Sequence, residues 1–190
     1  KIQKGAGFAE NPEFSYQLDD TLENASLHLK VKIKNLETAS LKWSITDCFT
    51  GAVVFLKNED LVGTQSCNDP EPTVASLDGI LSHVRLWNTW DKGTPFVYRV
   101  KVALCAKDGS VMESYEETTG FRKIEMHRTP EMTKFILNGK DFYMRGTAYF
   151  PDAYVSAMNE ERYRRDLLQI KNSGFNMLRV HVHVDLPVFY

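Results

Sequence analysis

The sequence predicts a mainly β chain, in which a sandwich of short antiparallel strands is followed by one strand–helix–strand unit. Between residues 27 and 126, apolar and polar residues alternate in several short runs, which is typical of strands with one buried face. Between residues 159 and 174, apolar residues recur at helical spacing instead, and a second apolar run follows directly. These two periods divide the chain into an all-β part and a mixed part.

Residues 1–127 are predicted to form one β-sandwich domain, with an extended lead-in at its start. The alternating runs lie at 27–33, 41–46, 52–56, 98–104, 111–118 and 121–126. Residues 57–79 are rich in turn-forming residues and predict a loop, with one weak strand at 74–77. About seven short strands separated by turn signals are typical of an immunoglobulin-like sandwich. The residues expected inside it include Leu29, Val31, Trp43, Val100 and Val102.

Residues 128–190 are predicted to begin a second domain, entered through a polar linker at 127–134. Asn138-Gly139 lies between two apolar runs and predicts a hairpin, because both positions of a type I′ turn need a positive φ. We expect the return strand at 142–146, before a loop that contains Pro151.

A helix is expected to begin after Asn159, which is a favourable N-cap, and to end before Gly174, which suits a left-handed residue after a helix. Glu160 and Glu161 place negative charge on its first turn, where the helix dipole favours it. The apolar face should contain Tyr163, Leu167 and Ile170, opposite a polar face made of Arg162, Arg165, Asp166, Gln169 and Asn172. A second strand at 176–184 would complete a βαβ unit with parallel strands.

The strand at 176–184 has one apolar face and one ionisable face. The apolar face should contain Leu178, Val180, Val182 and Val184. The other face would carry Arg179, His181 and His183. Ionisable residues on the inner face of a parallel strand, near its carboxyl end, are typical of the active site of a β/α barrel.

Several short motifs in this order resemble glycoside hydrolase family 2, which includes β-galactosidases, β-glucuronidases and β-mannosidases. In the second part they are Asn138-Gly139-Lys140, Arg145-Gly146, Pro151-Asp152 and Gly174-Phe175-Asn176-Met177-Leu178-Arg179-Val180-His181. Upstream, Leu86-Trp87, Pro95-Phe96-Val97-Tyr98 and Gly120-Phe121-Arg122 resemble the immunoglobulin-like domain of that family. The resemblance implies that 128–190 is the truncated first βαβ piece of a TIM barrel, which needs about 250 residues in full.

The resemblance also implies a retaining hydrolase that cleaves terminal β-glycosidic bonds with two carboxylic acids, one as acid/base and one as nucleophile. In the family, the acid/base glutamate ends the fourth barrel strand and the nucleophile ends the seventh. Both should therefore lie outside these 190 residues, and the fragment itself should be inactive. Asn159-Glu160 imitates the family's Asn-Glu motif, but helix capping explains this pair locally.

Four residues are the candidates for contact with the substrate or for orienting the nucleophile. The family arginine at the position of Arg179 binds the nucleophile glutamate, and a nearby cation keeps such a carboxylate ionised. His181 and His183 depart from the family pattern Arg-x-x-His-Tyr-Pro, which weakens a sugar-contacting role for either. Asp152 would lie near the sugar, although a Pro-Asp turn explains it equally well. We expect Arg145 to be structural.

The remaining features exclude several classes of partner. A formal net charge of −2 gives no global field for nucleic acid or anionic membranes, and no apolar run is long enough to span a bilayer. The three cysteines lack metal-ligand spacing, and a histidine pair without a third ligand predicts no zinc site. We predict a carbohydrate substrate and no cofactor or metal. The incomplete barrel is expected to be mobile, to pack against the sandwich, or to associate with another copy of the chain.

A second function class stays open. Exposed tryptophans can stack on sugar rings, and the sequence contains Trp87 and Trp90 close together. If they do so, the chain is a non-catalytic carbohydrate-binding or interaction module of immunoglobulin-like fold. Packing of both indole rings inside the protein is the competing explanation, and we favour it.

Overall fold

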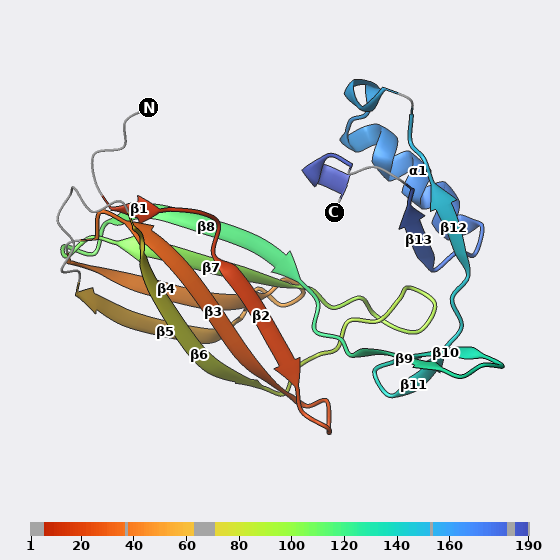
Figure 1. The fold of residues 1–190 in the computed structure, drawn as a ribbon, viewed down its shortest axis with the longest axis horizontal. Helices are drawn as coiled ribbons and strands as arrows, with labels where there is room; N and C mark the ends of the chain where they lie inside the picture. Colours follow the sequence, from red (N-terminus) through yellow and green to blue (C-terminus); the bar gives the residue numbers. More distant parts are fainter. Residues whose placement is uncertain (1–5, 37, 63–70, 153, 182–184, 190) are drawn as a thin grey trace. The chain divides into compact units, whose positions relative to one another are not determined.

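The computed structural model describes residues 6–36, 38–62, 71–152, 154–181 and 185–189. It is mainly β and divides into two compact units (Figure 1). The first unit comprises residues 1–88 and 94–123, and the second comprises 89–93 and 124–190. The domain boundary at 127/128 stays a prediction. No helix among the described residues is long and apolar enough to cross a membrane.

The first sheet of the first unit has strand β3 (Asn24–Lys34) at its centre. The short strand β1 (Gly7–Phe8) and β2 (Glu13–Leu18) pair with β3, and β6 (Thr73–Ser82) pairs with it over ten residues; all these pairings are antiparallel. The lead-in at the start of the chain therefore supplies two strands of this sheet.

The second sheet of this unit has the order β5-β4-β7-β8 and is antiparallel throughout. Its strands are β4 (Thr38–Asp47), β5 (Val53–Val62), β7 (Tyr98–Cys105) and β8 (Val111–Thr119). The two sheets lie face to face and share one hydrophobic core (Figure 1).

The core consists of alternate residues of both sheets, as the period of two predicts. Trp43 of β4 is fully buried, and its ring meets Phe55 of β5 and Phe14 of β2 edge-on at centroid distances of 4.7 and 6.1 Å. The predicted inward residues are confirmed, since each has an exposed fraction of 0%: Leu29, Val31, Trp43, Val100 and Val102.

Two sequence predictions for this unit are wrong. Residues 57–79 are not mainly loop, because β5 continues to Val62 and β6 begins at Thr73. Both strands have one solvated face, and their polar residues mimic a loop composition. Residues 121–126 do not form one strand: Phe121 is fully buried in the core outside any strand, and the next strand begins at Ile124.

The second unit contains a three-stranded antiparallel sheet of β9 (Ile124–Arg128), β10 (Thr133–Leu137) and β11 (Lys140–Phe142). The hairpin at Asn138-Gly139 is confirmed, with φ angles of 51° and 73° at its two turn residues. The linker predicted at 127–134 is wrong, since most of it belongs to β9, β10 and the turn between them.

The remainder of this unit is a strand–helix–strand unit. Strand β12 (Gly146–Tyr149) pairs in parallel with β13 (Met177–Val180), and helix α1 (Glu160–Asn172) connects them. Two short 3₁₀ helices, η1 (Val155–Ala157) and η2 (Pro187–Phe189), precede α1 and follow β13. The parallel pairing is confirmed, but the strand expected at 142–146 is wrong: β12 begins where that prediction ended.

Both ends of α1 agree with the sequence. The Asn159 side chain accepts a hydrogen bond from the Arg162 amide at 2.9 Å, and Gly174 has a φ of 85°. The amides of Gly174 and Phe175 donate to the carbonyls of Lys171 and Ile170, which is the Schellman pattern. These caps satisfy backbone groups that a helix cannot pair within itself.

Candidate functional site

The two faces of the parallel pair β12–β13 have different environments. On one face, Tyr149 and Leu178 pack with Tyr163 of α1 in a small hydrophobic cluster. On the other face, Ala148 of β12 is the register partner of Arg179 of β13, and both are exposed. The predicted parity of this strand is therefore confirmed at Leu178 and Arg179.

The other candidate residues follow the strands. His181 comes directly after β13, is exposed, and donates its amide hydrogen to the Tyr149 carbonyl at 3.2 Å. Asp152 follows β12, so both residues lie beyond the carboxyl end of the parallel pair. His183, with Val182 and Val184, lies outside the described residues. The substrate-contacting roles of Arg179, His181, His183 and Asp152 stay predictions.

Asp152 has well-defined local partners. One carboxylate oxygen is 2.9 Å from Arg162 Nη1 of α1, and the other accepts the Tyr154 amide hydrogen at 3.0 Å. The latter contact is a turn in which an Asp side chain bonds the backbone two residues on, as the Pro-Asp sequence suggested. These contacts hold Asp152 in one orientation, with 26% of its side chain exposed.

Two buried tyrosines donate hydrogen bonds to carboxylates beside α1. Tyr149 Oη donates to Asp166 Oδ2 at 3.0 Å, and Tyr163 Oη donates to Asp185 Oδ1 at 3.0 Å. Burial, and then the bond to Asp166, raises the pKa of Tyr149, so its phenol stays protonated as a donor. Asp166 therefore does not lie wholly on the solvated face of α1, where helical spacing had placed it. Sequence periodicity missed this pairing.

A second polar cluster lies at the amino ends of the two strands. Asp91 Oδ2 is 2.6 Å from Arg145 Nη2 and 3.2 Å from Asn176 Nδ2. Burial alone would raise the pKa of Asp91, but the polar groups of Thr89, Arg145 and Asn176 outweigh it and lower the pKa to about 2. Arg145 is thus bound to another protein group, which agrees with the structural role expected for it.

The two tryptophans proposed for sugar stacking also have protein partners. The Arg122 guanidinium lies over the half-buried Trp87 ring, 4.6 Å from its centroid. Trp90 is 41% exposed, and its Nε1 donates to the Phe175 carbonyl at 2.9 Å. These contacts favour packing as the explanation for both rings.

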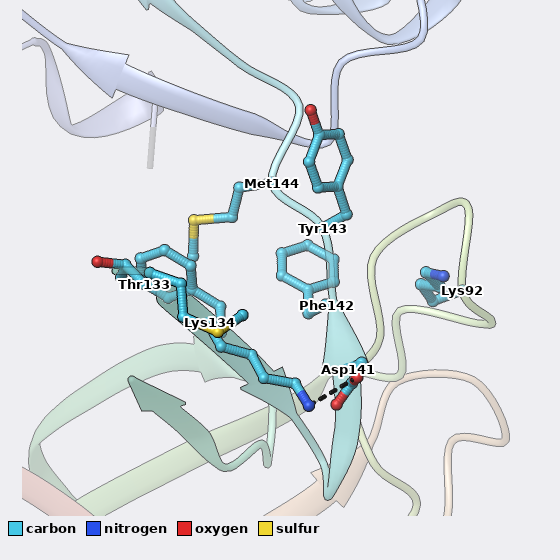
Figure 2. Close-up of a pocket in the computed structure, with 9 residues that line it drawn as sticks. Lys92, Thr133, Lys134, Asp141, Phe142, Tyr143 and Met144 are labelled. Carbon is cyan, nitrogen blue, oxygen red and sulfur yellow. Dashed lines mark ion pairs between the residues drawn. The ribbon is translucent and has the colours of Figure 1, made fainter. Parts of the chain in front are cut away.

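Figure 2 shows a hollow beside the β10–β11 hairpin, with a cavity of about 500 Å³. Lys134 and Asp141 face each other across the hairpin with 2.8 Å between Nζ and Oδ2. Aromatic and methionine side chains supply its apolar wall: Phe135, Phe142, Tyr143, Met132 and Met144. Among the described candidates, Arg179, His181 and Asp152 do not line this hollow.

In the described part of the chain, no group of three or more His, Cys, Asp or Glu side chains is arranged to hold an ion. Cys48 is exposed, Cys105 is buried and neither forms a disulfide; Cys67 lies outside the described residues.

The proteins to which this chain is similar, in sequence or in structure, are named as β-glycosidases. A β-galactosidase of Pectobacterium atrosepticum is 31% identical over 104 residues, which cover 53% of this chain and 10% of that protein. Among solved structures, a β-D-mannosidase from Dictyoglomus thermophilum covers 100% of this chain and 23% of its own, with a TM-score of 0.84 and 20% identity. A Parabacteroides merdae β-glucuronidase gives a TM-score of 0.76 at 24% identity, over 97% of this chain and 22% of its own.

The chain thus spans only a small part of the length of these relatives, and these two structural matches, both under 25% identity, establish the fold alone. The family model described as glycosyl hydrolases family 2 matches residues 8–122, which is more than half of the chain. This chain therefore belongs to glycosyl hydrolases family 2.

Proposed function

We propose that these 190 residues are part of a longer retaining glycoside hydrolase that cleaves terminal β-glycosidic bonds. The observation that carries this proposal is the family match over residues 8–122, followed in the chain by a parallel strand pair. The names of the similar proteins, β-galactosidase, β-glucuronidase and β-mannosidase, support a β-linked sugar as the substrate class. Both catalytic glutamates would lie outside this chain.

In this proposal, residues 1–127 are an immunoglobulin-like sandwich domain and residues 128–190 begin a TIM-barrel catalytic domain. The two antiparallel sheets with one shared core support the first part. The parallel β12–α1–β13 unit, in which α1 packs on the face of Tyr149 and Leu178, supports the second. The open face of the strand pair would then line the barrel.

The proposed role of Arg179 is to orient the nucleophile and keep it ionised. A carboxylate attacks the anomeric carbon only when it is deprotonated, and a guanidinium within reach lowers its pKa. Arg179 suits this role because it is exposed on the face opposite α1. His181 and Asp152, beyond the carboxyl ends of the strands, would contact sugar hydroxyls. The same role is proposed for His183.

The test replaces Arg179 in the longer protein. Removing a preorganised charge partner of a reacting group lowers kcat by about 10²–10³. Arg179→Lys should restore little, because one ammonium cannot reproduce the fork of a guanidinium. Arg165→Ala is the control, since Arg165 lies on α1 and is 61% exposed. Near-normal kcat in Arg179→Ala would contradict this role.

The 190-residue chain by itself should not hydrolyse aryl glycosides, since the proposal places both carboxylates elsewhere. Turnover above that of a mock purification would mean that the catalytic groups lie within the chain. The chain should also self-associate through its open strand face, which sedimentation over a range of concentrations would detect.

The second candidate is a carbohydrate-binding module, which the 41% exposure of Trp90 favours. Calorimetric titration of the chain with soluble β-glycans distinguishes the two candidates. Binding that is lost in Trp90→Ala would support the carbohydrate-binding module. Absence of binding would favour the hydrolase fragment.

A further inference from the structure

The segment 89–93 lies between β6 and β7 in the chain but belongs to the second unit. It brings the Asp91 carboxylate, only 12% exposed, to the residues that precede both parallel strands. Arg145 directly precedes β12, and Asn176 directly precedes β13. One carboxylate oxygen contacts both, at 2.6 Å from Arg145 Nη2 and 3.2 Å from Asn176 Nδ2.

Arg145 and Asn176 are also bound to each other, by one hydrogen bond to the Asn176 side chain and one between their backbones. The Arg145 amide donates to Asn176 Oδ1 at 2.8 Å, and the Asn176 amide donates to the Arg145 carbonyl at 3.0 Å. Each side chain then reaches one more carbonyl: Arg145 Nε contacts Gly174 at 2.8 Å, and Asn176 Nδ2 contacts Tyr143 at 3.1 Å. The network therefore holds the two chain segments that lead into β12 and β13.

This network sits where the strand register is decided. The first register pair, Gly146 with Met177, comes directly after Arg145 and Asn176, and Ala148 with Arg179 follows from it. A slip of one residue would turn every side chain of a strand to the opposite face. Four residues of pairing give a short ladder, so a fixed start contributes strongly to its register.

We propose that Asp91 is a positioning residue, which clamps the amino ends of β12 and β13 and so fixes the register that sets Arg179 beside Ala148. Charge-assisted hydrogen bonds are short and about twice as strong as neutral ones, which suits a clamp built from one carboxylate. Trp90 adds a second attachment of the same segment through its bond to the Phe175 carbonyl. The consequence for catalysis rests on the proposed function of Arg179, whereas the clamp itself does not.

The test compares Asp91→Ala with Asp152→Ala in the whole 190-residue chain. Both variants remove an Asp–Arg ion pair of the second unit, but the Asp152 pair joins a loop to α1 and touches neither strand start. Amide hydrogen exchange at 146–149 and 177–180 should become about ten- to a hundred-fold faster in Asp91→Ala. It should change little in Asp152→Ala.

The register is measured separately, through cross-strand nuclear Overhauser effects between Ala148 and Arg179. These should be lost or shifted in Asp91→Ala and restored in part by Asp91→Glu, which keeps the charge. Faster exchange with unchanged cross-strand effects would overturn the proposal, because Asp91 would then only add stability. Unchanged exchange would overturn it as well. If Asp91→Ala does not fold, Asp91→Asn and Asn176→Ala provide the same two readouts.

These readouts involve no substrate, so they separate the clamp from the proposed hydrolase activity. In the longer protein, Asp91→Ala should lower kcat more than it raises KM, since Arg179 would be misplaced at the reacting centre. If Asp91→Ala accelerates exchange and shifts the register but does not change kcat, the clamp is supported and the proposed role of Arg179 is contradicted.

Discussion

Replacing Tyr163 by Phe should destabilise the helix–strand part of the second unit. Tyr163 is 2% exposed, and its hydroxyl donates to Asp185, which is 5% exposed, at 3.0 Å. The same hydroxyl accepts the Leu186 amide hydrogen at 3.4 Å. Removing it takes one donor from a buried carboxylate and one acceptor from an amide. The cost should be about 1–3 kcal/mol, toward the upper value because the acceptor is a carboxylate.

Tyr149→Phe provides the matched comparison. Tyr149 is also buried and donates to a carboxylate at 3.0 Å, but Asp166 is 18% exposed and keeps two bonds from Arg165, at 3.0 and 3.2 Å. Water and Arg165 therefore compensate for the lost donor, and the cost should be about 1 kcal/mol or less.

Native-state hydrogen exchange of the α1 amides is the assay for both tyrosine variants, because it reports the opening of this unit separately from that of the sandwich. Tyr163→Phe should accelerate exchange more than Tyr149→Phe does. Equal or reversed effects would refute the reasoning that burial of the carboxylate sets the cost.

Three further predictions concern stability. Trp43→Ala should lower the unfolding free energy of the first unit by about 3–5 kcal/mol in urea denaturation, and a loss below about 1 kcal/mol would contradict its place in the core. Gly174→Ala should cost about 1 kcal/mol because of the positive φ, measured as a lower melting temperature of α1 by circular dichroism. The pKa of Asp91 is lowered from 3.8 to about 2, so its stabilisation is complete above 3.8 and is lost as the pH falls through about 2. This stabilisation is about 2 kcal/mol, and Asp91→Asn should therefore flatten the acid dependence of exchange in 177–180.

The strands of the sandwich were predictable where one face is buried and the other is exposed to solvent. Leu29 and Val31 alternate with charged residues because their side chains point into the shared core while their neighbours meet water. The caps of α1 were predictable for a similar reason: Asn159 and Gly174 act on backbone groups within a few residues of themselves.

Strand β6 was predicted only as a weak strand at 74–77, because the rest of its sequence resembles a turn. Asp78-Gly79 resembles a hairpin signal, yet it lies in the middle of a strand that pairs with β3. A glycine is needed here because of packing and not because of a turn. A Cβ at Gly79 would lie 2.5 Å from Cζ of Phe55 in the other sheet. Such a close approach between sheets depends on a residue far away in the chain, which local patterns do not encode.

For the strand face that carries Arg179, the sequence predicts which side chains share the face, and the structure adds their neighbours on β12. Parity alone places Arg179 opposite Leu178, but it does not say which residue stands beside it on the neighbouring strand. In the observed register, two small residues of β12 lie beside large residues of β13: Gly146 beside Met177 and Ala148 beside Arg179. An added Cβ at Gly146 would lie 2.3 Å from Met177 Cε, so this side chain already occupies the space that the glycine leaves. Small residues on β12 thus make room for large ones on β13, and a slip of one residue would set Thr147 beside Arg179 and lose this fit. The Asp91 network and this size pattern therefore select the same register, by two independent physical means.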